Sequence, residues 1–407
     1  MKFAHFSDVH IGSWRDPKLH NTSTEVFAKA VDFCMAQQVD FVLIAGDLFN
    51  TSLPPIDKLK AVVTKLKELQ TRDIPIYVTA GSHDYSPSGK TMLEVLEEAG
   101  LLINVVKGEV QDNKLKLNFT IDKKTGVKIT GMIGKKGMLE RSYYEALDTT
   151  NLENEPGYKI FMFHTAISEL KPKELEMMDS TPISLLPKGF NYYAGGHVHI
   201  IKQEQLPGYG TITYPGALFP ANFKELEQFH HGGLYLVDDN KIAWHPIALH
   251  KVRTIKLDCN QKTPQEVEQA LFEEIGNHDY ANTIITIRLF GCLRQGRVSD
   301  INFQEITQRL YDRNAHVVLK NTNALTTKEF EAINADAKST EDIELKLVKE
   351  HLGQIPIQDM TPEKEEMLII SLMKTLSMEK DEGERNLDFE NRLRAEVEQI
   401  LTNEKLI

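Results

Sequence analysis

Aspartate and histidine residues recur directly after short apolar segments in the first 200 residues. Asp8 and His10 follow the segment KFAHFS (2–7), and Asp47 follows DFVLIA (40–45). Ligand sites in open sheets gather beyond the carboxyl ends of the strands, so these side chains are expected to converge. Later apolar segments end in the same way, at Ser82, His83, Asp84, His164, His197 and His199.

Metal-dependent phosphoryl chemistry is the reaction that such a set of side chains favours. One D-x-H or G-D dipeptide is common, but five of the 14 histidines stand at predicted strand ends. Buried carboxylates and imidazoles require a positive partner. This donor set suits Mn, Fe or Zn better than Ca or Mg. One carboxylate shared by two ions would place them about 3.5–4 Å apart, the spacing of two-metal phosphoryl chemistry.

Short apolar strands alternate with amphipathic helices through residues 1–250, which predicts a parallel or mixed sheet covered by helices. Helices are expected over 24–38 and 55–70, where apolar residues recur at helical spacing. Beyond the first two strands named above, the expected strands are IPIYVTA (74–80), VKITGMIG (127–134), KIFMFH (159–164) and FNYYAGG (190–196).

The pattern changes near residue 253, which predicts a core over 1–253 and a smaller α/β domain over 254–335. Residues 336–407 carry 18 acidic and 10 basic side chains, so 8 of the 12 net negative charges lie there. In this tail, Thr361-Pro362-Glu363 is typical of a helix start, with a capping hydroxyl followed by proline. A second amphipathic helix is expected near 387–402.

Composition excludes several classes of protein. A net charge of −12 argues against a general nucleic-acid coat. No apolar run reaches the ~18–20 residues of a membrane span, and MKFAHFSDVH lacks the apolar core of a secretory signal. The three distant cysteines argue against a disulfide framework or a cysteine zinc site: Cys34, Cys259 and Cys292. We therefore expect a cytoplasmic protein.

Five motifs, in this order, resemble the calcineurin-like metallophosphoesterases. They are D-V-H at 8–10, G-D at 46–47, G-S-H-D at 81–84, His164 and G-H-V-H at 196–199. Within that superfamily, FSDVHIG, AGDLFN and YPGALFP (214–220) resemble the meiotic-recombination-eleven family of DNA double-strand-break repair nucleases, whose bacterial member is SbcD.

The resemblance implies a fold, an activity and partners. The fold would be α/β, a four-layer α/β/β/α sandwich over 1–253 with a DNA-contacting capping domain over 254–335. The activity would be a manganese-dependent exonuclease and endonuclease of double-stranded DNA ends. The chain would form a homodimer, and its tail over 336–407 would bind an ABC-type repair ATPase with a coiled coil.

The resemblance also implies residue roles. Asp8, His10 and His199 would hold one of two Mn²⁺ ions, and Asp47 would bridge the two. The second ion would be held by His164, His197 and Ser82. Because Ser82 replaces the usual asparagine, we hypothesise weaker binding of that ion.

His83 would supply a proton to the leaving 3′-oxygen, and Asp84 would accept a hydrogen bond from its ring. DNA contacts are expected at Tyr85, Ser86, Lys90, Arg294 and Arg297.

Other interpretations remain open from the sequence. The basic loops are equally compatible with solvated surface, and the tail with packing on its own core. The same motifs would serve a small-molecule or cyclic-nucleotide phosphodiesterase. A weakly catalytic scaffold is a third alternative, in which poor metal binding at Ser82 leaves only a partner-binding role.

Overall fold

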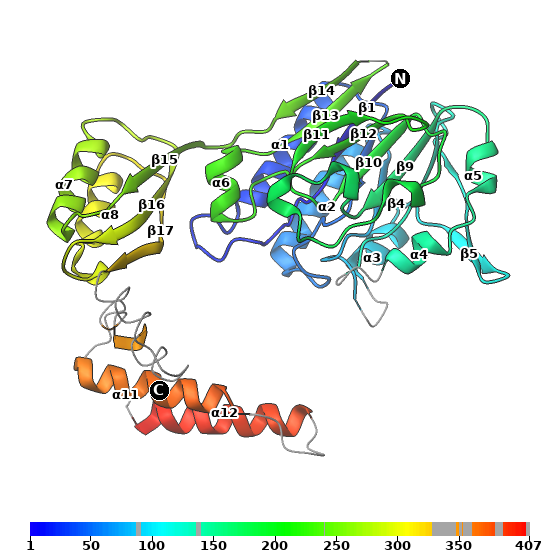
Figure 1. Cartoon of the computed structure of the whole chain (residues 1–407). Helices are drawn as coiled ribbons and strands as arrows, with labels where there is room; N and C mark the ends of the chain where they lie inside the picture. Colours follow the sequence, from blue (N-terminus) through cyan, green and yellow to red (C-terminus); the bar gives the residue numbers. More distant parts are fainter. Residues whose placement is uncertain are drawn as a thin grey trace. The chain divides into compact units, whose positions relative to one another are not determined.

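The computed structural model of the 407-residue chain consists of two compact units, Met1–Arg253 and Thr254–Ile407 (Figure 1). The predicted DNA-contacting and ATPase-binding roles of parts of the second unit stay predictions. The structure describes residues 1–86, 91–135, 140–239, 241–327, 347–349, 352, 360–378 and 386–403.

Two six-stranded mixed sheets form the centre of the first unit. The first sheet has the order β14-β13-β1-β2-β3-β4, and the second has the order β11-β12-β10-β9-β8-β7. The strands of the first sheet are β1 (Lys2–Phe6), β2 (Phe41–Ala45), β3 (Ile76–Thr79), β4 (Ile103–Asn104), β13 (Gly233–Asp238) and β14 (Lys241–Pro246). Those of the second are β7 (Thr120–Ile121), β8 (Lys128–Gly131), β9 (Lys159–His164), β10 (Tyr192–Gly196), β11 (Ile201–Gln205) and β12 (Thr211–Pro215).

Strand alternation builds the core on both faces of the second sheet. In β9, Ile160 and Met162 join the cluster that also contains Phe3 and Phe41 of the first sheet. Phe161 and Phe163 belong to a separate cluster on the opposite face. Side chains of a strand point alternately to the two faces, so one short strand contributes to two cores.

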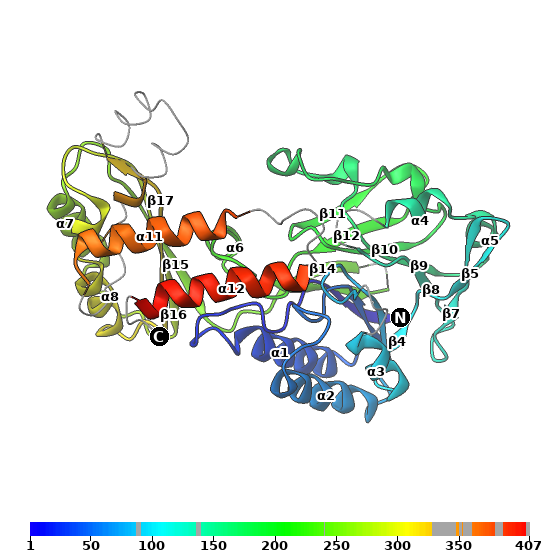
Figure 2. The ribbon, with the colours of Figure 1, turned by 90° about the horizontal axis from the view of Figure 1, so that it is seen from below.

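Helices α1 (Thr22–Ala36) and α2 (Ile56–Gln70) cover the first sheet (Figure 2). The rings of Phe6 in β1 and Phe27 in α1 meet edge to face, with centroids 6.3 Å apart. The remaining elements of the unit are α3 (Met92–Glu98), α4 (Arg141–Glu145), α5 (Thr150–Asn154), α6 (Phe223–Phe229), the 3₁₀ turns η2 (Ser168–Leu170), η3 (Lys173–Leu175) and η4 (Ile183–Leu185), and the hairpin β5 (Gly108–Gln111)–β6 (Lys114–Leu117).

The second unit contains a three-stranded sheet with its own core. Its strands are β15 (Lys251–Asp258), β16 (Thr283–Leu293) and β17 (Val317–Thr327), in the order β15-β16-β17. Buried side chains of α7 (Pro264–Ile275), α8 (Phe303–Tyr311) and β16 form one apolar cluster. The short turn η5 (Val298–Asp300) precedes α8.

Two further helices, α11 (Pro362–Leu376) and α12 (Asn386–Asn403), lie side by side (Figures 1 and 2). The Thr361 hydroxyl accepts a hydrogen bond from the Lys364 N–H, so the helix start predicted from Thr-Pro-Glu is confirmed. Among the residues that the structure describes, no helix is long and apolar enough to cross a membrane.

The predicted α/β class is confirmed, as a mixed α/β fold with several mixed sheets. The sequence analysis did not predict the antiparallel partners of β1 and β12. β13 pairs antiparallel with β1, and β11 pairs antiparallel with β12. The arrangement of a capping domain and a tail around the core stays a prediction.

A buried histidine between the two sheets predicts a pH-dependent stability. His5 Nδ1 lies 3.0 Å from Tyr192 Oη and 3.1 Å from Thr213 Oγ1, and burial lowers the pKa of His5 to about 3. Below about pH 6.5 the unfolded chain binds a proton that the folded chain does not. The contribution of His5 to stability is therefore full above pH 6.5 and is lost as the pH falls toward 3.

We expect the free energy of unfolding to fall by about 2 kcal/mol between pH 7 and pH 5 because of His5. The His5→Leu variant should lack this part of the loss. Urea unfolding can be followed by tryptophan fluorescence, since both tryptophans, Trp14 and Trp244, lie in the first unit. Equal losses in wild type and variant would contradict the assignment.

Candidate metal centre

The parallel strands of both sheets end at the candidate site. In the first sheet β1 pairs parallel with β2, and β2 with β3. In the second sheet β9 pairs parallel with β10, with His164 opposite Gly196. The predicted residues stand at these strand ends or directly after them, so pairing alone brings segments from positions 8 to 199 together.

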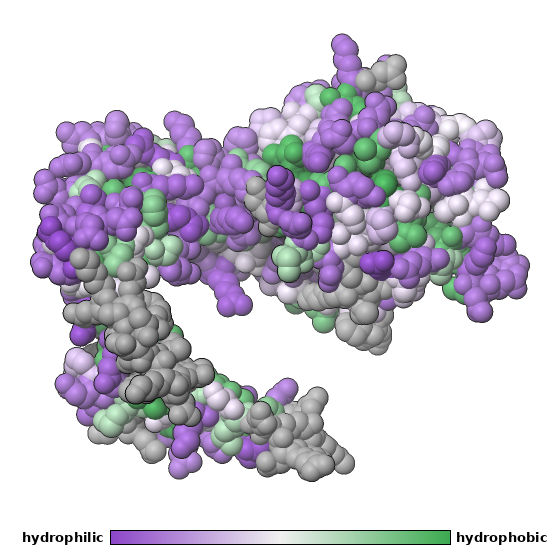
Figure 3. Space-filling view, in the orientation of Figure 1, coloured by the Kyte–Doolittle hydropathy of each residue, from purple (hydrophilic) through white to green (hydrophobic). Residues whose placement is uncertain are grey.

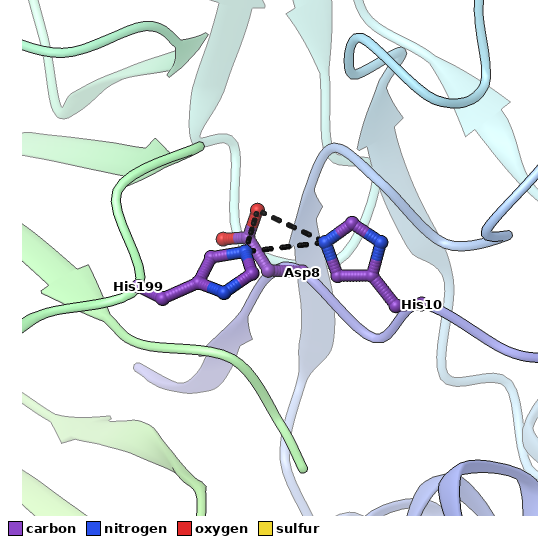
Figure 4. Close-up of side chains that lie close together, drawn as sticks. All are labelled: Asp8, His10 and His199. Atoms are coloured by element: carbon purple, nitrogen blue, oxygen red, sulfur yellow. Dashed lines mark hydrogen bonds and ion pairs between the residues drawn. The ribbon is translucent and has the colours of Figure 1, made fainter. Parts of the chain in front are cut away.

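Asp8, His10 and His199 form the first group of possible ligands (Figure 4). The Nε2 atoms of His10 and His199 lie 3.1 Å apart, and His199 Nε2 lies 3.5 Å from Asp8 Oδ1. The other ring nitrogen of His199 lies 2.9 Å from Glu225 Oε1. A carboxylate only accepts, so Nδ1 carries the proton and Nε2 faces the group. Two imidazole nitrogens this close require a proton or a cation between them.

Asp8, Asp47 and His164 form a second group, and it is buried. Asp47 Oδ2 lies 3.2 Å from His164 Nε2 and 3.7 Å from His10 Nε2. The His164 Nδ1–H donates to the Ala45 carbonyl at 2.8 Å, which fixes the ring with Nε2 toward the carboxylates. Asp47 therefore lies between the two groups, where a bridging carboxylate would be needed.

Of the other two predicted ligands, His197 lies beside this cluster, and Ser82 is next to His83 in the chain. The ring centroid of His197 is 5.2 Å from that of His164. Ser82 is buried between Gly81 and His83 after β3. Their predicted roles as ligands stay predictions.

The charges of the cluster compensate one another in the absence of an added cation. Burial alone would raise the pKa of Asp8, but the hydrogen bond and charge of His199 outweigh it and lower the pKa to about 2. Burial opposes ionisation of Asp47 too, yet the charge of His164 lowers its pKa below the usual range. In turn, Asp47 and Asp8 overcome burial and raise the pKa of His164 to about 9. Asp8 and Glu225 overcome burial and raise the pKa of His199 to about 10.

The predicted hydrogen bond from His83 to Asp84 is wrong. His83 Nδ1 lies 2.8 Å from the Asn50 carbonyl oxygen, which can only accept, so Nδ1 carries the proton. The Asp84 carboxylate instead accepts from the backbone N–H groups of Leu48, Phe49 and Gly81. Asp84 therefore ties the loops after β2 and β3 together and does not orient His83.

His83 itself lies where the sequence analysis placed it, against the candidate site. Its backbone N–H donates to Asp47 Oδ1 at 2.7 Å, and its ring meets the His10 ring edge to face at 4.8 Å. With Nδ1 bonded to the Asn50 carbonyl, Nε2 is the nitrogen available for proton transfer. His10, Asp47 and His83 also form a third closely spaced group, so this geometry alone would also allow His83 to be a ligand.

Four of the candidate ligands hold a left-handed backbone conformation. The φ values are 51° for Asp8, 46° for His10, 53° for Asp47 and 86° for His197. Such conformations are uncommon for residues with a side chain and concentrate at functional sites. They turn the chain sharply after each strand and aim successive side chains into one cluster.

Motif glycines allow the strand ends to approach closely. A Cβ on Gly46 would clash with His164 Nδ1, and a Cβ on Gly196 would clash with the Ala45 carbonyl oxygen. Both glycines precede a candidate ligand in the chain. In the G-D and G-H-x-H motifs, the residue after the glycine is a candidate ligand, and the glycine itself leaves room for the neighbouring strand end.

The residues predicted to contact DNA differ in their surroundings in the structure. Lys135 Nζ lies 4.8 Å from the ring centroid of Tyr85 and 4.6 Å from that of Tyr143. Ser86 is half-buried beside Tyr85, and Lys90 lies outside the described residues. In the second unit, Arg294 pairs with an exposed glutamate of α7 and the Arg297 N–H donates to Asp300. These contacts with DNA stay predictions.

Sequence reasoning missed three groups that support the site. Glu225 orients His199, the Asn50 carbonyl orients His83, and the Ser7 hydroxyl donates to Asp8 at 2.5 Å. Glu225 stands 26 residues after its partner, and a backbone carbonyl leaves no trace in residue type. Only Ser7, adjacent to Asp8, stood where a local signal could have been found.

The donor set fits divalent cations. The first two groups combine buried carboxylate oxygens with imidazole nitrogens, and the facing nitrogens of His10 and His199 have the spacing of ligands to a shared ion. Carboxylate and carbonyl partners of the outer ring nitrogens are typical of histidines that bind metals.

The Gly46→Ala variant should bind Mn²⁺ about 10–100-fold more weakly, because the added methyl group displaces His164. Gly12→Ala is a matched control, since Gly12 also has a left-handed backbone (φ 90°, against 87° for Gly46) but no atom near its would-be Cβ. Calorimetric titration of both variants would test this. Equal affinities in the two variants would show that backbone strain, and not the contact with His164, is responsible.

A model of the family "Calcineurin-like phosphoesterase" matches residues 1–200. The DNA double-strand break repair protein Mre11 of Methanopyrus kandleri is 27% identical over 266 residues, 60% of this chain and 57% of that one. The chain thus spans less than two thirds of that relative. Mre11 of Sulfolobus acidocaldarius is 26% identical over 358 residues, 84% of this chain and 87% of that one.

A dimetal phosphatase from Danio rerio is the subject of a solved structure that aligns with 60% of this chain and 95% of its own, at 11% identity and a TM-score of 0.38. The sequence comparisons agree with the motifs and with their convergence at one sheet edge. Over residues 1–200 the chain is therefore similar to the calcineurin-like phosphoesterases, and over more than half of its length it is similar to the archaeal Mre11 DNA double-strand break repair proteins.

Proposed function

We propose that this chain is a metal-dependent DNA exonuclease and endonuclease that hydrolyses phosphodiester bonds at DNA ends. The observation that carries the proposal is the convergence of five side chains: His164 lies 3.9 Å from Asp8 and 3.2 Å from Asp47, His199 lies 3.5 Å from Asp8, and His10 lies 3.1 Å from His199. Carboxylate and imidazole donors in this number suit a pair of Mn²⁺ ions.

The predicted ligand sets are those of the resemblance. Asp8, His10 and His199 would hold one ion, Asp47 would bridge, and His164, His197 and Ser82 would hold the other. Divalent cations bound there supply an activated water and stabilise charge on the phosphate. We retain the hypothesis that serine at position 82 weakens the second site.

His83 is proposed as the proton donor to the leaving oxygen. The His83 Nδ1–H donates a hydrogen bond to the Asn50 carbonyl, and the His83 backbone N–H donates one to Asp47. Both ends of the residue are therefore fixed, and Nε2 remains to deliver a proton. Such general acids contribute about 10²–10⁴-fold to rate.

DNA binding beside the site is supported by the cluster of Tyr85, Lys135 and Tyr143. Lys135 Nζ contacts both rings and lies 2.6 Å from Tyr143 Oη. An ammonium group attracts phosphate, and tyrosine rings stack on unpaired bases. We propose further contacts at Ser86, Lys90, Arg294 and Arg297 on the basis of the resemblance alone.

Purified chain with Mn²⁺ should degrade end-labelled DNA. His83→Ala should lose cleavage at least about hundredfold while keeping Mn²⁺ affinity, because the residue acts on the proton and not on the ions. Asp47→Ala should lose both. His20→Ala, at an exposed histidine of the same unit, is the matched control and should change neither. Normal cleavage by His83→Ala would refute the acid role, and loss of Mn²⁺ binding would make His83 a ligand.

The same assay separates the alternative functions. A generic phosphodiester offered beside DNA would be the only substrate cleaved by a small-molecule phosphodiesterase. If the protein cleaves neither DNA nor the generic phosphodiester, the result would support the interpretation of the chain as a scaffold.

We also propose that α11 and α12 bind a coiled-coil ABC-type ATPase, and that the chain forms a homodimer, as the resemblance implies. The support in the structure is the exposure of Met367 and Leu376 on α11, at 61% and 62%. Apolar side chains on a paired helical surface suit docking of a helical partner.

Met367→Glu should abolish co-elution with the purified ATPase and leave Mn²⁺-dependent cleavage unchanged. Lys364→Glu, an exposed position on the same helix, adds negative charge without removing an apolar contact and should keep most of the binding. A loss of thermal stability in Met367→Glu would instead support a tail that packs on its own chain.

A further inference from the structure

A cavity of about 760 Å³ opens beside the candidate metal centre, and the mechanism above does not use it. One wall is α6, another is the segment 172–178 around η3, and the floor is the loop 197–201. His197 and His199 line it, so its inner end is the metal site itself.

The lining has two kinds of side chain. Leu175, Met178, Ile200 and Phe229 supply apolar surface, and all four are only half-buried. Lys224 and Gln228, both on α6 and exposed, also line the cavity. Figure 3 shows exposed apolar surface near β11 and β12, on a face that is otherwise largely hydrophilic.

This combination matches the chemistry of an unpaired nucleobase. A base has two apolar faces and a polar edge, and it needs apolar walls together with a few hydrogen-bonding groups. The volume lies within the range of small-molecule sites. A phosphate held by the site's histidines would place the attached nucleoside within reach of this cavity.

We propose that the cavity binds the base of the nucleotide next to the scissile phosphate, unstacked from its neighbours. The inference rests on the proposed nuclease function and refines its substrate to a strand whose terminal nucleotides are unpaired. Met178 and Phe229 contact the faces of the base, Gln228 bonds its edge, and Lys224 meets the adjoining phosphate. The site then selects for a base at that position without reading which base it is.

The matched pair Met177 and Met178 allows a direct test. Met178 lines the cavity, whereas Met177 is 97% exposed and lies outside its lining. A Met178→Trp side chain would fill the cavity, and Met177→Trp would add the same ring to the surface. The substrates are single-stranded oligonucleotides with either a normal or an abasic nucleotide beside the cleaved linkage, and bis(p-nitrophenyl) phosphate.

Wild type and Met177→Trp should cleave the normal oligonucleotide about tenfold faster, in kcat/KM, than the abasic one. Met178→Trp should reduce that ratio to about one while leaving the affinity for Mn²⁺ unchanged, since Met178 is not among the candidate ligands. If the wild type cleaves normal and abasic DNA at equal rates, the proposal that the cavity binds a base is wrong, while the proposed nuclease function is unaffected.

Two other outcomes also count against the proposal. A loss of Mn²⁺ affinity in Met178→Trp would show that the substitution disturbs the metal centre and would remove the support that its lowered ratio gives. No cleavage of any oligonucleotide by wild type, with the ester still hydrolysed, would overturn the nuclease function, and the base pocket with it.

Discussion

Two buried carboxylates, Asp8 and Asp47, determine how this site is built. Moving an ionised carboxylate out of water costs several kcal/mol unless a positive group and hydrogen bonds compensate. Here the compensation comes from His164 and His199, whose pKa values the neighbouring carboxylates raise against the effect of burial, so that both rings favour the protonated form. Divalent cations would take the place of those protons, so the cluster is electrostatically prepared for metal binding.

The same carboxylates hold the strand ends together. The His197 N–H, after β10, donates to Asp8, after β1, and so links the two sheets. The His83 N–H, after β3, donates to Asp47, after β2. These charge-assisted bonds offset the strain of the left-handed residues, which is about 1–2 kcal/mol for each. Removing one carboxylate would therefore release a strand end as well as a ligand.

Sequence reasoning succeeded where local pattern determines structure. The strand over 159–164 was predicted at its observed bounds and the helix over 55–70 to within one residue, because apolar spacing defines both. Convergence of the candidate ligands followed from one rule, that parallel strands end at the same edge. Strand β13 was missed because its pairing with β1 joins residues more than 200 positions apart.

Hydrogen-bond partners within the site were the part that sequence could not supply. Asp84 is adjacent to His83, and proximity in the chain favoured a bond between them. The chain turns between the two residues, however, and sends the carboxylate toward three backbone N–H groups. Burial and the nearby charge of Asp47 raise the pKa of Asp84 to about 7 despite those bonds.

The change of partner alters how the His83 ring is held. The Asn50 carbonyl orients the ring through Nδ1–H, the task that Asp84 was expected to perform. The ring also belongs to a closely spaced group with His10 and Asp47. A proton donor to a leaving alkoxide requires such a fixed position, because proton transfer needs the donor nitrogen within hydrogen-bond reach of the oxygen. The backbone at Asn50 thus acts in the proposed mechanism, although its side chain has no role in it.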